Sequence, residues 1–428
     1  MRFEPVLLAV VVTGCAQSTA PTWYRDVQPI VQRKCGTCHE AGGIGPFSLK
    51  TLADWKAVEP AALAALRDGR MPPFPARTDC AEYSPTQAMP AEYRETIEKW
   101  VASGGAEGDP KTFRELPGAV DRLTRVDLSL PLSVPYTPTH APDQYRCYLV
   151  DWPITDPQFV TGYELRPGAK DLVHHADIFF IHPDAAAAWQ AKDDADPAPG
   201  WECYDIPFAD EGGWIGTWVP GLRGVDFPEG TGLRIPVGGK IYVQVHYNLP
   251  SGNSESDVST LDLRLAPRVD QPAGVQAVSD PSWLTQHTMT IPAGEKDVTH
   301  SFVVDPTVLA PLISRTFVGN KPLTLYATTM HMHQLGQSAF LKVHRADGGT
   351  ECVVDIPRWD FHWQLSYTLA KPVVINPGDQ LEVSCTWDNT QANQPLIDGM
   401  QAMAVDRNWG ARTQDEMCVG GIYVTEGK

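Results

Sequence analysis

The sequence has no excess of basic residues. Its 428 residues include 34 Lys and Arg against 52 Asp and Glu, a formal net charge of −18. A protein that binds nucleic acid is expected to carry a basic face, so this composition argues against nucleic acid as a partner. Beyond the N-terminus the chain also lacks any run of roughly eighteen uncharged apolar residues, which a membrane-spanning helix needs. We therefore expect membrane contact only through an N-terminal lipid anchor.

Long helical patterns are scarce as well. The chain contains 35 glycines and 38 prolines, which predict many turns and short strands rather than helical bundles. Aromatic residues make up 9% of the chain, a content that argues against disorder. At about 150 residues per domain, the length predicts two to three domains.

The first twenty residues predict export. Residues 6–12 form an apolar run that is too short to span a bilayer and ends at a Thr-Gly-Cys sequence containing Cys15. This pattern resembles a bacterial lipobox, with ordinary cleavage near Ala20 as the alternative. We assign residues 1–20 to a signal peptide and lipobox, and expect an exported periplasmic or outer-membrane lipoprotein of a bacterium. Disulfides are permitted in that compartment.

Cys35, Cys38 and His39 have the Cys-x-x-Cys-His spacing of a c-type haem attachment site. The two thiols would form thioethers to the haem, and the histidine would bind its iron. A thioredoxin-type redox pair would lie beside a βαβ pattern, and a zinc site would need two further nearby ligands; the sequence has neither. Apolar stripes instead predict helices before the motif, over 54–68 and over 90–102, which is the helix pattern of class I cytochromes c.

The second iron ligand is expected after the middle helix. Met71 is fixed there by two prolines and is our prediction, with Met89 as the rival; the alternative is a methionine packed in the core. A methionine ligand raises the haem potential relative to a second imidazole. We assign residues 21–115 to this small all-α haem c domain, and residues 104–117 resemble a linker.

The remaining three hundred residues show short β-rich runs separated by Pro, Gly, Asn and Asp. This spacing predicts two all-β antiparallel sandwiches, jelly-roll-like in architecture. A Pro- and Gly-bearing stretch near residues 266–282 divides them, so we place the domains at 116–268 and 269–428.

Histidines cluster at three places in this β-rich part. His246 ends a strand on which Gln244 and His246 share the face opposite the apolar residues. The neighbours His174 and His175 would point to opposite faces of a regular strand. They can bind one metal only if the backbone is irregular there, or if the two rings use different nitrogens.

His331 and His333 lie on one face of a predicted strand, opposite Met330 and Met332, which we expect in the core. Imidazole suits zinc, copper, iron and nickel, whereas thioether sulfur favours copper(I). The pattern predicts an all-nitrogen site and a site with two nitrogens and one methionine sulfur. Spacing alone does not choose that methionine from Met400, Met403 and Met417.

The other histidines occur singly. We expect these to be structural residues that form hydrogen bonds in turns: His140, His182, His287, His300, His344 and His362.

Five stretches, in order, resemble the copper type II, ascorbate-dependent monooxygenases, which include peptidylglycine α-hydroxylating monooxygenase and dopamine β-monooxygenase. The stretches lie within roughly residues 120–428. They are Val173-His174-His175, Gln244-Val245-His246-Tyr247-Asn248, His331-Met332-His333-Gln334-Leu335-Gly336, Ser384-Cys385-Thr386-Trp387-Asp388-Asn389 and Asp415-Glu416-Met417-Cys418.

This resemblance implies two antiparallel sandwiches with one copper in each, facing a solvent-filled cleft. It assigns the electron-storing copper to His174, His175 and His246. It assigns the copper that binds O₂ and substrate to His331, His333 and Met417. Gln244 matches a glutamine near the electron path of the family. The fused haem domain is foreign to the animal enzymes and resembles bacterial members.

The resemblance also implies a disulfide pairing and a limit on substrate. It implies disulfides Cys147–Cys203 and Cys385–Cys418, and leaves Cys80 and Cys352, which we expect to stay unpaired, with an interdomain bridge as the alternative. Peptide-amidating members carry an arginine where this chain has Thr329, and an Asn and a Tyr where it has Val419 and Gly421. Bidentate recognition of a substrate carboxylate is therefore missing at that place.

We therefore expect a copper-dependent monooxygenase that hydroxylates a C–H bond of a small organic substrate with O₂. Two copper ions and a haem c would be its cofactors, and the haem would receive electrons from an external donor. The alternative is a non-catalytic redox or copper-carrying exported lipoprotein. A zinc hydrolase is disfavoured because the sequence has no H-E-x-x-H motif.

Overall fold

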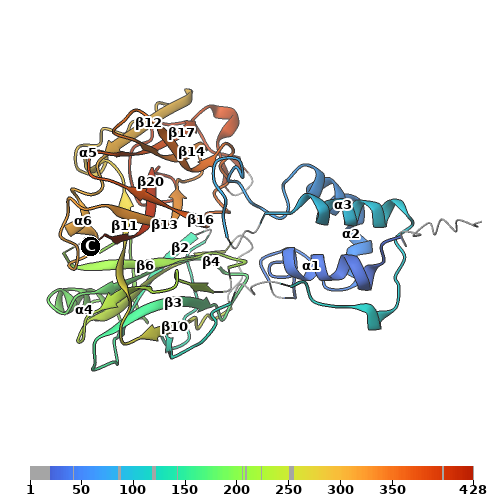
Figure 1. Ribbon diagram of the computed structural model, residues 1–428, viewed down its shortest axis with the longest axis horizontal. Coiled ribbons are helices and arrows are strands. Elements are labelled where there is room, and N and C mark those ends of the chain that lie inside the picture. Colours follow the sequence, from blue (N-terminus) through green and yellow to red (C-terminus); the bar gives the residue numbers. More distant parts are fainter. Residues whose placement is uncertain are drawn as a thin grey trace, which may run out of the picture.

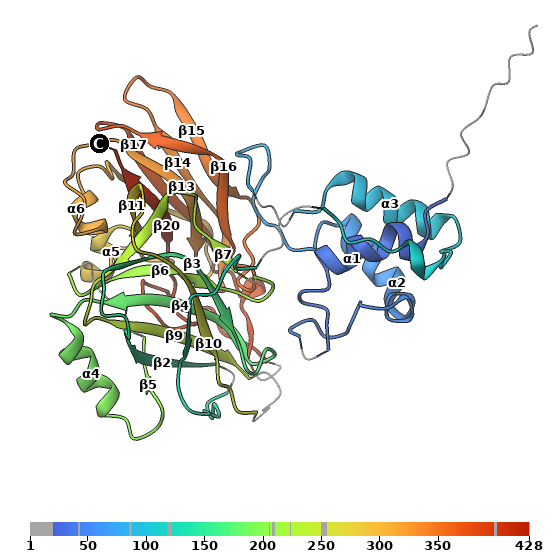
Figure 2. The same ribbon diagram turned by 60° about the horizontal axis from the view of Figure 1, so that its bottom comes forward.

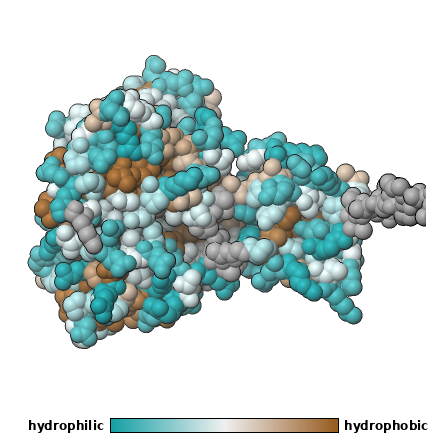
Figure 3. Space-filling view, in the orientation of Figure 1, coloured by the Kyte–Doolittle hydropathy of each residue, from teal (hydrophilic) through white to brown (hydrophobic). Residues whose placement is uncertain are grey.

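The computed structural model describes residues 20–41, 43–84, 88–117, 122–141, 143–204, 206–207, 210–222, 224–249, 255–397 and 400–427. A small helical domain lies beside a larger β-rich body in two views (Figures 1 and 2). The expected lipobox, with Cys15, lies outside these residues. Among the helices described, none is both long and apolar enough to cross a membrane. The visible surface is mostly hydrophilic, with apolar side chains gathered in patches (Figure 3).

Tryptophans form the core of the helical domain. Trp23, Trp55 and Trp100 are at most 1% exposed, and their ring centroids lie 5.6–6.3 Å apart. The middle helix begins at a capping box between Thr51 and Asp54. The predicted helices are confirmed, whereas the likeness to a cytochrome c stays a prediction. The elements are η1 (Trp23–Val27), α1 (Gln28–Lys34), α2 (Leu52–Arg67), α3 (Ala91–Ala102) and η2 (Pro110–Thr112).

The first sandwich packs a five-stranded sheet, in the order β5-β2-β9-β4-β6, against the β1-β10-β3-β8 part of a larger sheet. Alternate residues of β9, such as Val243 and Val245, enter this core with Leu261 and Leu263 of β10. Its elements are β1 (Leu128–Pro131), β2 (Asp143–Asp151), β3 (Gln158–Arg166), β4 (Val173–Ile181), α4 (Ala186–Asp194), β5 (Trp201–Glu202), β6 (Gly212–Trp218), β7 (Val225–Asp226), β8 (Thr231–Ile235), β9 (Lys240–Asn248) and β10 (Thr260–Ala266).

The second sandwich packs a four-stranded sheet, in the order β12-β17-β14-β15, against the β11-β20-β13-β16 part of the larger sheet. Leu341 and Val383 meet Leu325 and Val424 in this core. Its elements are β11 (Gln271–Val278), α5 (Pro281–Gln286), β12 (Lys296–Val304), α6 (Ala310–Ile313), β13 (Leu323–His331), β14 (Gly336–His344), β15 (Thr350–Ile356), β16 (Ser366–Ile375), β17 (Gln380–Asp388), η3 (Gln391–Asn393), β18 (Leu396–Ile397), β19 (Met400–Gln401) and β20 (Val419–Glu426).

One sheet runs through both sandwiches. β8 and β11 pair in parallel, so that nine strands, including β7 beside β3, form a continuous sheet. Its other pairs are antiparallel. The predicted antiparallel sandwich architecture is confirmed, apart from this one parallel pair. The boundary expected at 268/269 falls between β10 and β11.

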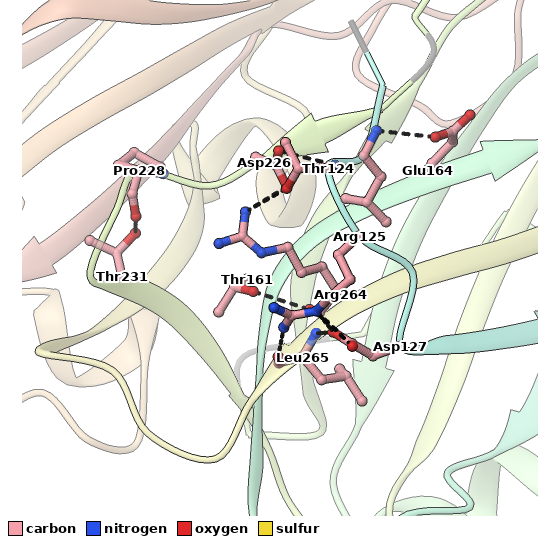
Figure 4. Close-up of polar contacts among 11 residues, drawn as sticks. Thr124, Arg125, Asp127, Thr161, Glu164, Asp226, Pro228, Thr231, Arg264 and Leu265 are labelled. Carbon is pink, nitrogen blue, oxygen red and sulfur yellow. Dashed lines mark hydrogen bonds and ion pairs between the residues drawn. The ribbon is translucent and has the colours of Figure 1, made fainter. Parts of the chain in front are cut away.

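Polar contacts hold the segment that enters the first sandwich (Figure 4). The Arg125 guanidinium donates to Asp127 at 2.7 Å and to the Leu265 carbonyl at 2.8 Å. Asp127 in turn accepts the N–H of Leu265 at 2.8 Å, and the N–H of Leu123 donates to Glu164 at 3.2 Å. The segment that precedes β1 is thereby fixed to β10 and β3.

A second segment, residues 74–84, fixes the helical domain to the second sandwich. Tyr83 forms an isolated β-bridge with Leu369, and its hydroxyl donates to the Val353 carbonyl at 3.1 Å. The ring of Tyr83 also packs on Tyr367, with centroids 5.2 Å apart. Residues 74–84 therefore contact the second sandwich, and residues 123–127 contact the first.

Six of the described cysteines form three disulfides. Two match the pairing implied by the resemblance, and the third joins the helical domain to β15: Cys147–Cys203, Cys385–Cys418 and Cys80–Cys352. The prediction that Cys80 and Cys352 stay unpaired is therefore wrong. The two residues are 272 positions apart, and only the packing of residues 74–84 on the second sandwich brings them together.

This disulfide predicts how the protein responds to proteolysis. Trypsin can cut after the exposed residues Lys111 and Arg114. The helical fragment should stay attached to the β-rich body on a non-reducing gel, because Cys80–Cys352 still links them, and should separate once reductant is added. Release by trypsin, without reductant, of a fragment that contains Cys80 would contradict the pairing.

Candidate metal centres

A β-bulge brings His174 and His175 to the same side of β4. Neighbouring side chains of a regular strand point to opposite faces. The register between β4 and β9 shifts between Val173 and His175, and His175 pairs with His246. A bulge re-aims side chains in this way. The irregular backbone that a shared metal requires is therefore present.

Three imidazole nitrogens converge at the bulge. Nδ1 of His175 lies 3.1 Å from Nδ1 of His174 and 3.4 Å from Nδ1 of His246. With metal–nitrogen bonds of about 2.0 Å, these separations correspond to nitrogen–metal–nitrogen angles of roughly 100–115°. Such angles suit a tetrahedral or trigonal site, so the three residues can hold one metal ion.

Burial favours the neutral form of two of these histidines, His174 and His175. Each of the three is at most 7% exposed. Burial, followed by the nearby imidazoles of His246 and His362, lowers the pKa of His174 to about 3. Burial and the surrounding histidines likewise hold the pKa of His175 well below its usual value. A neutral imidazole offers the lone pair that a metal needs.

Asp143 orients His246. The Oδ1 atom of Asp143 lies 2.8 Å from Nε2 of His246 and accepts a second hydrogen bond, of 2.9 Å, from Asn248. When Nε2–H donates to the carboxylate, Nδ1 keeps its lone pair for a metal. Burial alone would raise the pKa of Asp143, but the contacts with His246 and Asn248 bring it below its usual value. Tyr145 stacks on the His246 ring at 4.3 Å, which fixes the ring plane.

A second pair of imidazoles lies at the end of β13. The ring centroids of His331 and His333 are 5.1 Å apart. Nδ1 of His331 is hydrogen-bonded to the side-chain oxygen of Gln364, and Nδ1 of His333 lies 3.0 Å from the carbonyl of Asp415. Because both acceptors are oxygens, both Nδ1 atoms carry the proton. Both Nε2 atoms are left free to bind a metal.

The three candidate methionine ligands of this second site differ in their surroundings. Met417 lines the same cavity as His331 and His333. Met400 and Met403 are 72% and 77% exposed, and they do not line that cavity among the residues described. The two methionines that alternate with the histidines on β13 are buried in the core, as predicted.

Glu416 fixes the chain next to Met417. Its buried carboxylate accepts the backbone N–H of His333 at 3.0 Å and of Leu335 at 2.7 Å. The Trp387 indole donates to the same carboxylate at 2.8 Å. Burial raises the pKa of Glu416 to about 7 despite these hydrogen bonds. The Cys385–Cys418 disulfide holds the other side of Met417, so its position is well defined.

One cavity of about 280 Å³ joins the two clusters. His175 faces it from the first sandwich, and His331, His333 and Met417 face it from the second. Much of the remaining wall is apolar and includes Phe179, Trp214, Leu312 and Ile313.

A single carboxylate faces this cavity among the lining residues that the structure describes. It belongs to Asp177, which accepts a hydrogen bond from the Thr217 hydroxyl. Burial raises the pKa of Asp177 to about 6. The described lining includes no Lys or Arg side chain.

Gln244 also lines the cavity. It is 8% exposed, and its amide nitrogen lies 3.9 Å from the sulfur atoms of Cys147 and Cys203. Gln244 therefore lies between a disulfide and the space that the two clusters share. Its expected place near an electron path stays a prediction.

The thiols of the Cys-x-x-Cys-His motif carry no disulfide. Neither Cys35 nor Cys38 is part of a disulfide, and both are partly exposed. Burial raises the pKa of the Cys35 thiol to about 12, the opposite of what a nucleophilic redox cysteine needs. Nδ1 of His39 lies 3.0 Å from the Phe47 carbonyl, so its Nε2 is free for iron. The three side chains fit a haem c better than a redox pair.

The two candidate methionines of the helical domain lie in different surroundings. Met89 packs against the tryptophan core together with Cys35. Met71 follows α2 and is half-buried, outside that cluster as described. Met71 stays the predicted iron ligand, and the packing of Met89 is the observation that favours the rival.

Three side chains at these centres were not found from the sequence: Asp143, Gln364 and His362. We expected His362 to be a structural histidine that forms a hydrogen bond in a turn. It lies in a turn, and its Nδ1 lies 3.2 Å from Nε2 of His174. His362 and Gln364 belong to a loop, where no periodicity marks a side chain as buried or facing a site. Asp143 opens β2, and only its pairing with β9 brings it to His246.

Residues 283–425 match the family described as copper type II ascorbate-dependent monooxygenase, C-terminal domain. The chain is similar to MOXD1 homolog 1 of Drosophila melanogaster, with 23% identity over 64% of this chain and 39% of the relative. It is also similar to tyramine beta-hydroxylase of Caenorhabditis briggsae, with 24% identity over 60% of this chain and 40% of the relative. Dopamine beta-hydroxylase of Canis lupus familiaris is 23% identical over 65% of this chain and 42% of the relative. The chain thus spans about two fifths of these relatives. Residues 283–425 thus match the C-terminal domain of the copper type II ascorbate-dependent monooxygenase family, and a larger part of the chain is similar to the relatives named above.

The orientation of His246 by Asp143 can be tested by copper affinity. Asp143→Ala should weaken copper binding at the three-histidine cluster by roughly 10–100-fold, because the variant loses the acceptor that orients His246. Competition with a chelator measures the affinity. Asp151→Ala removes an 85% exposed carboxylate at the other end of β2 and serves as the control. Equal affinities of the two variants would contradict the role.

Proposed function

We propose that this protein is a dicopper monooxygenase that hydroxylates a C–H bond of a small organic substrate with O₂. The observation that carries the proposal is the cavity of about 280 Å³ into which both imidazole clusters open. Similarity to the copper monooxygenases supports the class of reaction, and the cavity supports a substrate that reaches the second cluster.

The donor sets fit two different roles for copper. His174, His175 and His246 would hold one copper through three converging Nδ1 atoms. His331 and His333 would hold the other through their free Nε2 atoms, with the thioether of Met417. A thioether favours copper(I), the form that meets O₂, whereas an all-nitrogen site accepts both oxidation states. Bound copper would supply electron storage at the first site and O₂ activation at the second.

The overall reaction sets what the chain's residues must do. It balances as R–H + O₂ + 2 e⁻ + 2 H⁺ → R–OH + H₂O, so each turnover takes two electrons besides those of the C–H bond. The protein holds the ligands in place, positions the substrate and excludes side reactions. We assign Gln244, which lines the cavity between the clusters, to the electron path.

The cavity favours an uncharged or cationic substrate. Its described walls are largely apolar, with Asp177 as their carboxylate and no cationic side chain. Thr329 stands where amidating relatives have an arginine, and it donates to the Leu365 carbonyl at 3.0 Å. A Cβ at Gly421 would lie 2.6 Å from Thr329 and 3.0 Å from Trp214, so a larger side chain would not fit there. These features argue against peptides bound through a carboxylate. Tyramine and dopamine, which appear in the names of two relatives, are small amines of the kind that this cavity favours.

We further propose that a haem c bound by Cys35, Cys38 and His39, with Met71 as the other iron ligand, delivers the electrons. A close contact between the helical domain and the first sandwich supports this electron route. A Cβ on Gly221 would lie only 2.9 Å from the Cys38 sulfur, so the backbone there approaches the haem-bearing thiol closely.

A route toward the three-histidine site starts at that contact. The residue after Gly221, Leu222, accepts a 2.7 Å hydrogen bond from the Trp218 indole through its carbonyl. Trp218 lies on β6 opposite the residue that follows His175 on β4. Lys170 of the first sandwich adds an ion pair of 2.8 Å with Glu40, which lies directly after the haem motif. Although burial would raise the pKa of Glu40, Lys170 and Lys50 lower it to about 2.

Three disulfides suit the proposed export of the protein, since disulfides persist in oxidising compartments. The lipid anchor at Cys15 and a bacterial periplasmic or outer-membrane location are part of this proposal. A non-catalytic copper-carrying lipoprotein remains the alternative, but a carrier needs no enclosed substrate cavity beside its metal sites.

Replacing the thioether tests the second site. Met417→Ala should abolish hydroxylation, measured as copper-dependent O₂ consumption with substrate and reductant. Haem content and binding of the three-histidine copper should be unchanged, because only the second donor set is altered. Met403→Ala removes a 77% exposed methionine and is the control. Turnover of Met417→Ala near that of the control would show that Met417 is not a ligand.

Rapid mixing tests the haem as electron donor. When fully reduced protein meets O₂ and substrate, haem reoxidation should keep pace with product formation. A variant with Cys35→Ala and Cys38→Ala should carry no covalent haem and should turn over only with an added small reductant. A haem that stays reduced through repeated turnovers would contradict the proposed route.

A further inference from the structure

One loop of the second sandwich contacts ligands of both clusters. This loop, residues 357–365, connects β15 and β16. The Phe361 ring stacks on His174 with centroids 5.5 Å apart and lies edge-on to His333 at 6.2 Å. Gln364 accepts from Nδ1 of His331, as described above, and Nδ1 of His362 lies 3.2 Å from Nε2 of His174. The contact between His362 and His174 crosses from one sandwich to the other.

The geometry of His174 determines which atom donates in this contact. Nδ1 of His174 faces Nδ1 of His175 at 3.1 Å and belongs to the converging set, so it needs its lone pair for a metal. The proton of a neutral His174 must then be on Nε2. Nε2–H points at Nδ1 of His362, which accepts the hydrogen bond.

We propose that His362 is a positioning residue of the three-histidine copper site. It holds the tautomer and ring orientation of His174, as Asp143 does for His246. Asp143 belongs to the same sandwich as the ligand that it orients, whereas His362 comes from the other one. The geometry of the first copper site therefore depends on how the second sandwich is docked. This inference rests on the proposed assignment of copper to His174, His175 and His246.

The local structure allows His362 to be replaced without loss of fold. His362 is exposed, while Phe361 beside it is buried and anchors the loop. The N–H of His362 donates to the Asp360 side chain at 3.0 Å, a contact that survives any substitution except proline. Because water competes for an exposed acceptor, we expect an effect near the lower end of the range for such orienting groups, about tenfold in metal affinity.

The test compares His362→Ala with His362→Asn. Asparagine places its Oδ1 where histidine has Nδ1, so it restores an acceptor without an imidazole. His331→Ala serves as the common background, which disables the second site and leaves one copper to observe. Copper(II) affinity by chelator competition and the EPR spectrum are the readouts, and neither needs turnover. His287→Asn changes an exposed histidine that lies outside both clusters and is the control.

His362→Ala should raise the copper dissociation constant about tenfold and change the copper hyperfine coupling. His362→Asn and His287→Asn should match the background protein in both. If His362→Ala kept the copper affinity and the EPR spectrum of the background protein, the inference would be overturned. An Asn variant that behaves like Ala would also overturn it, because the imidazole would then bind the metal itself. Failure of the background protein to bind copper would instead contradict the proposed function.

Discussion

The architecture depends on three buried imidazoles whose Nδ1 lone pairs converge on one point. Neutral lone pairs at such separations repel one another unless a cation lies between them. The arrangement persists because β4 carries a bulge, β9 pairs beside it, and oxygen or nitrogen acceptors hold the outer ring nitrogens. The second cluster uses the opposite ring nitrogens, and the carboxylate of Glu416 fixes its backbone. The fold thus presents two differently built donor sets to one cavity.

Much of this could be predicted from sequence because it depends on short periodicities. Alternation along β9 and β13 correctly placed His246 opposite Val245, and His331 opposite Met330. The adjacency of His174 and His175 required an irregular strand, and the bulge supplies it. The choice of Met417 and the pairing of Cys385 with Cys418 came from family resemblance instead. The structure agrees with that pairing, and Met417 faces the cavity, whereas its rivals are exposed.

The missed features all depend on contacts between distant parts of the chain. Cys80 meets Cys352 only after residues 74–84 have packed on the second sandwich. His362 meets His174 across 188 positions and from a loop, where hydrophobic patterning gives no orientation. No local propensity carries such information, because the pairing is set by how the sandwiches and the helical domain dock. The helical domain is the reverse case: its Cys-x-x-Cys-His motif is explicit in the sequence, and its proposed role depends on the close approach of Cys38 to Gly221.

X-ray absorption at the copper edge, combined with copper analysis, tests the central claim most directly. The account predicts two copper ions per chain, and a sulfur scatterer on one of the two in the reduced protein. The sulfur contribution should come from a single thioether, with imidazole nitrogens completing both sites. A single copper per chain, or two coppers with nitrogen and oxygen neighbours alone, would contradict the assignment of these clusters as the two copper centres of a monooxygenase.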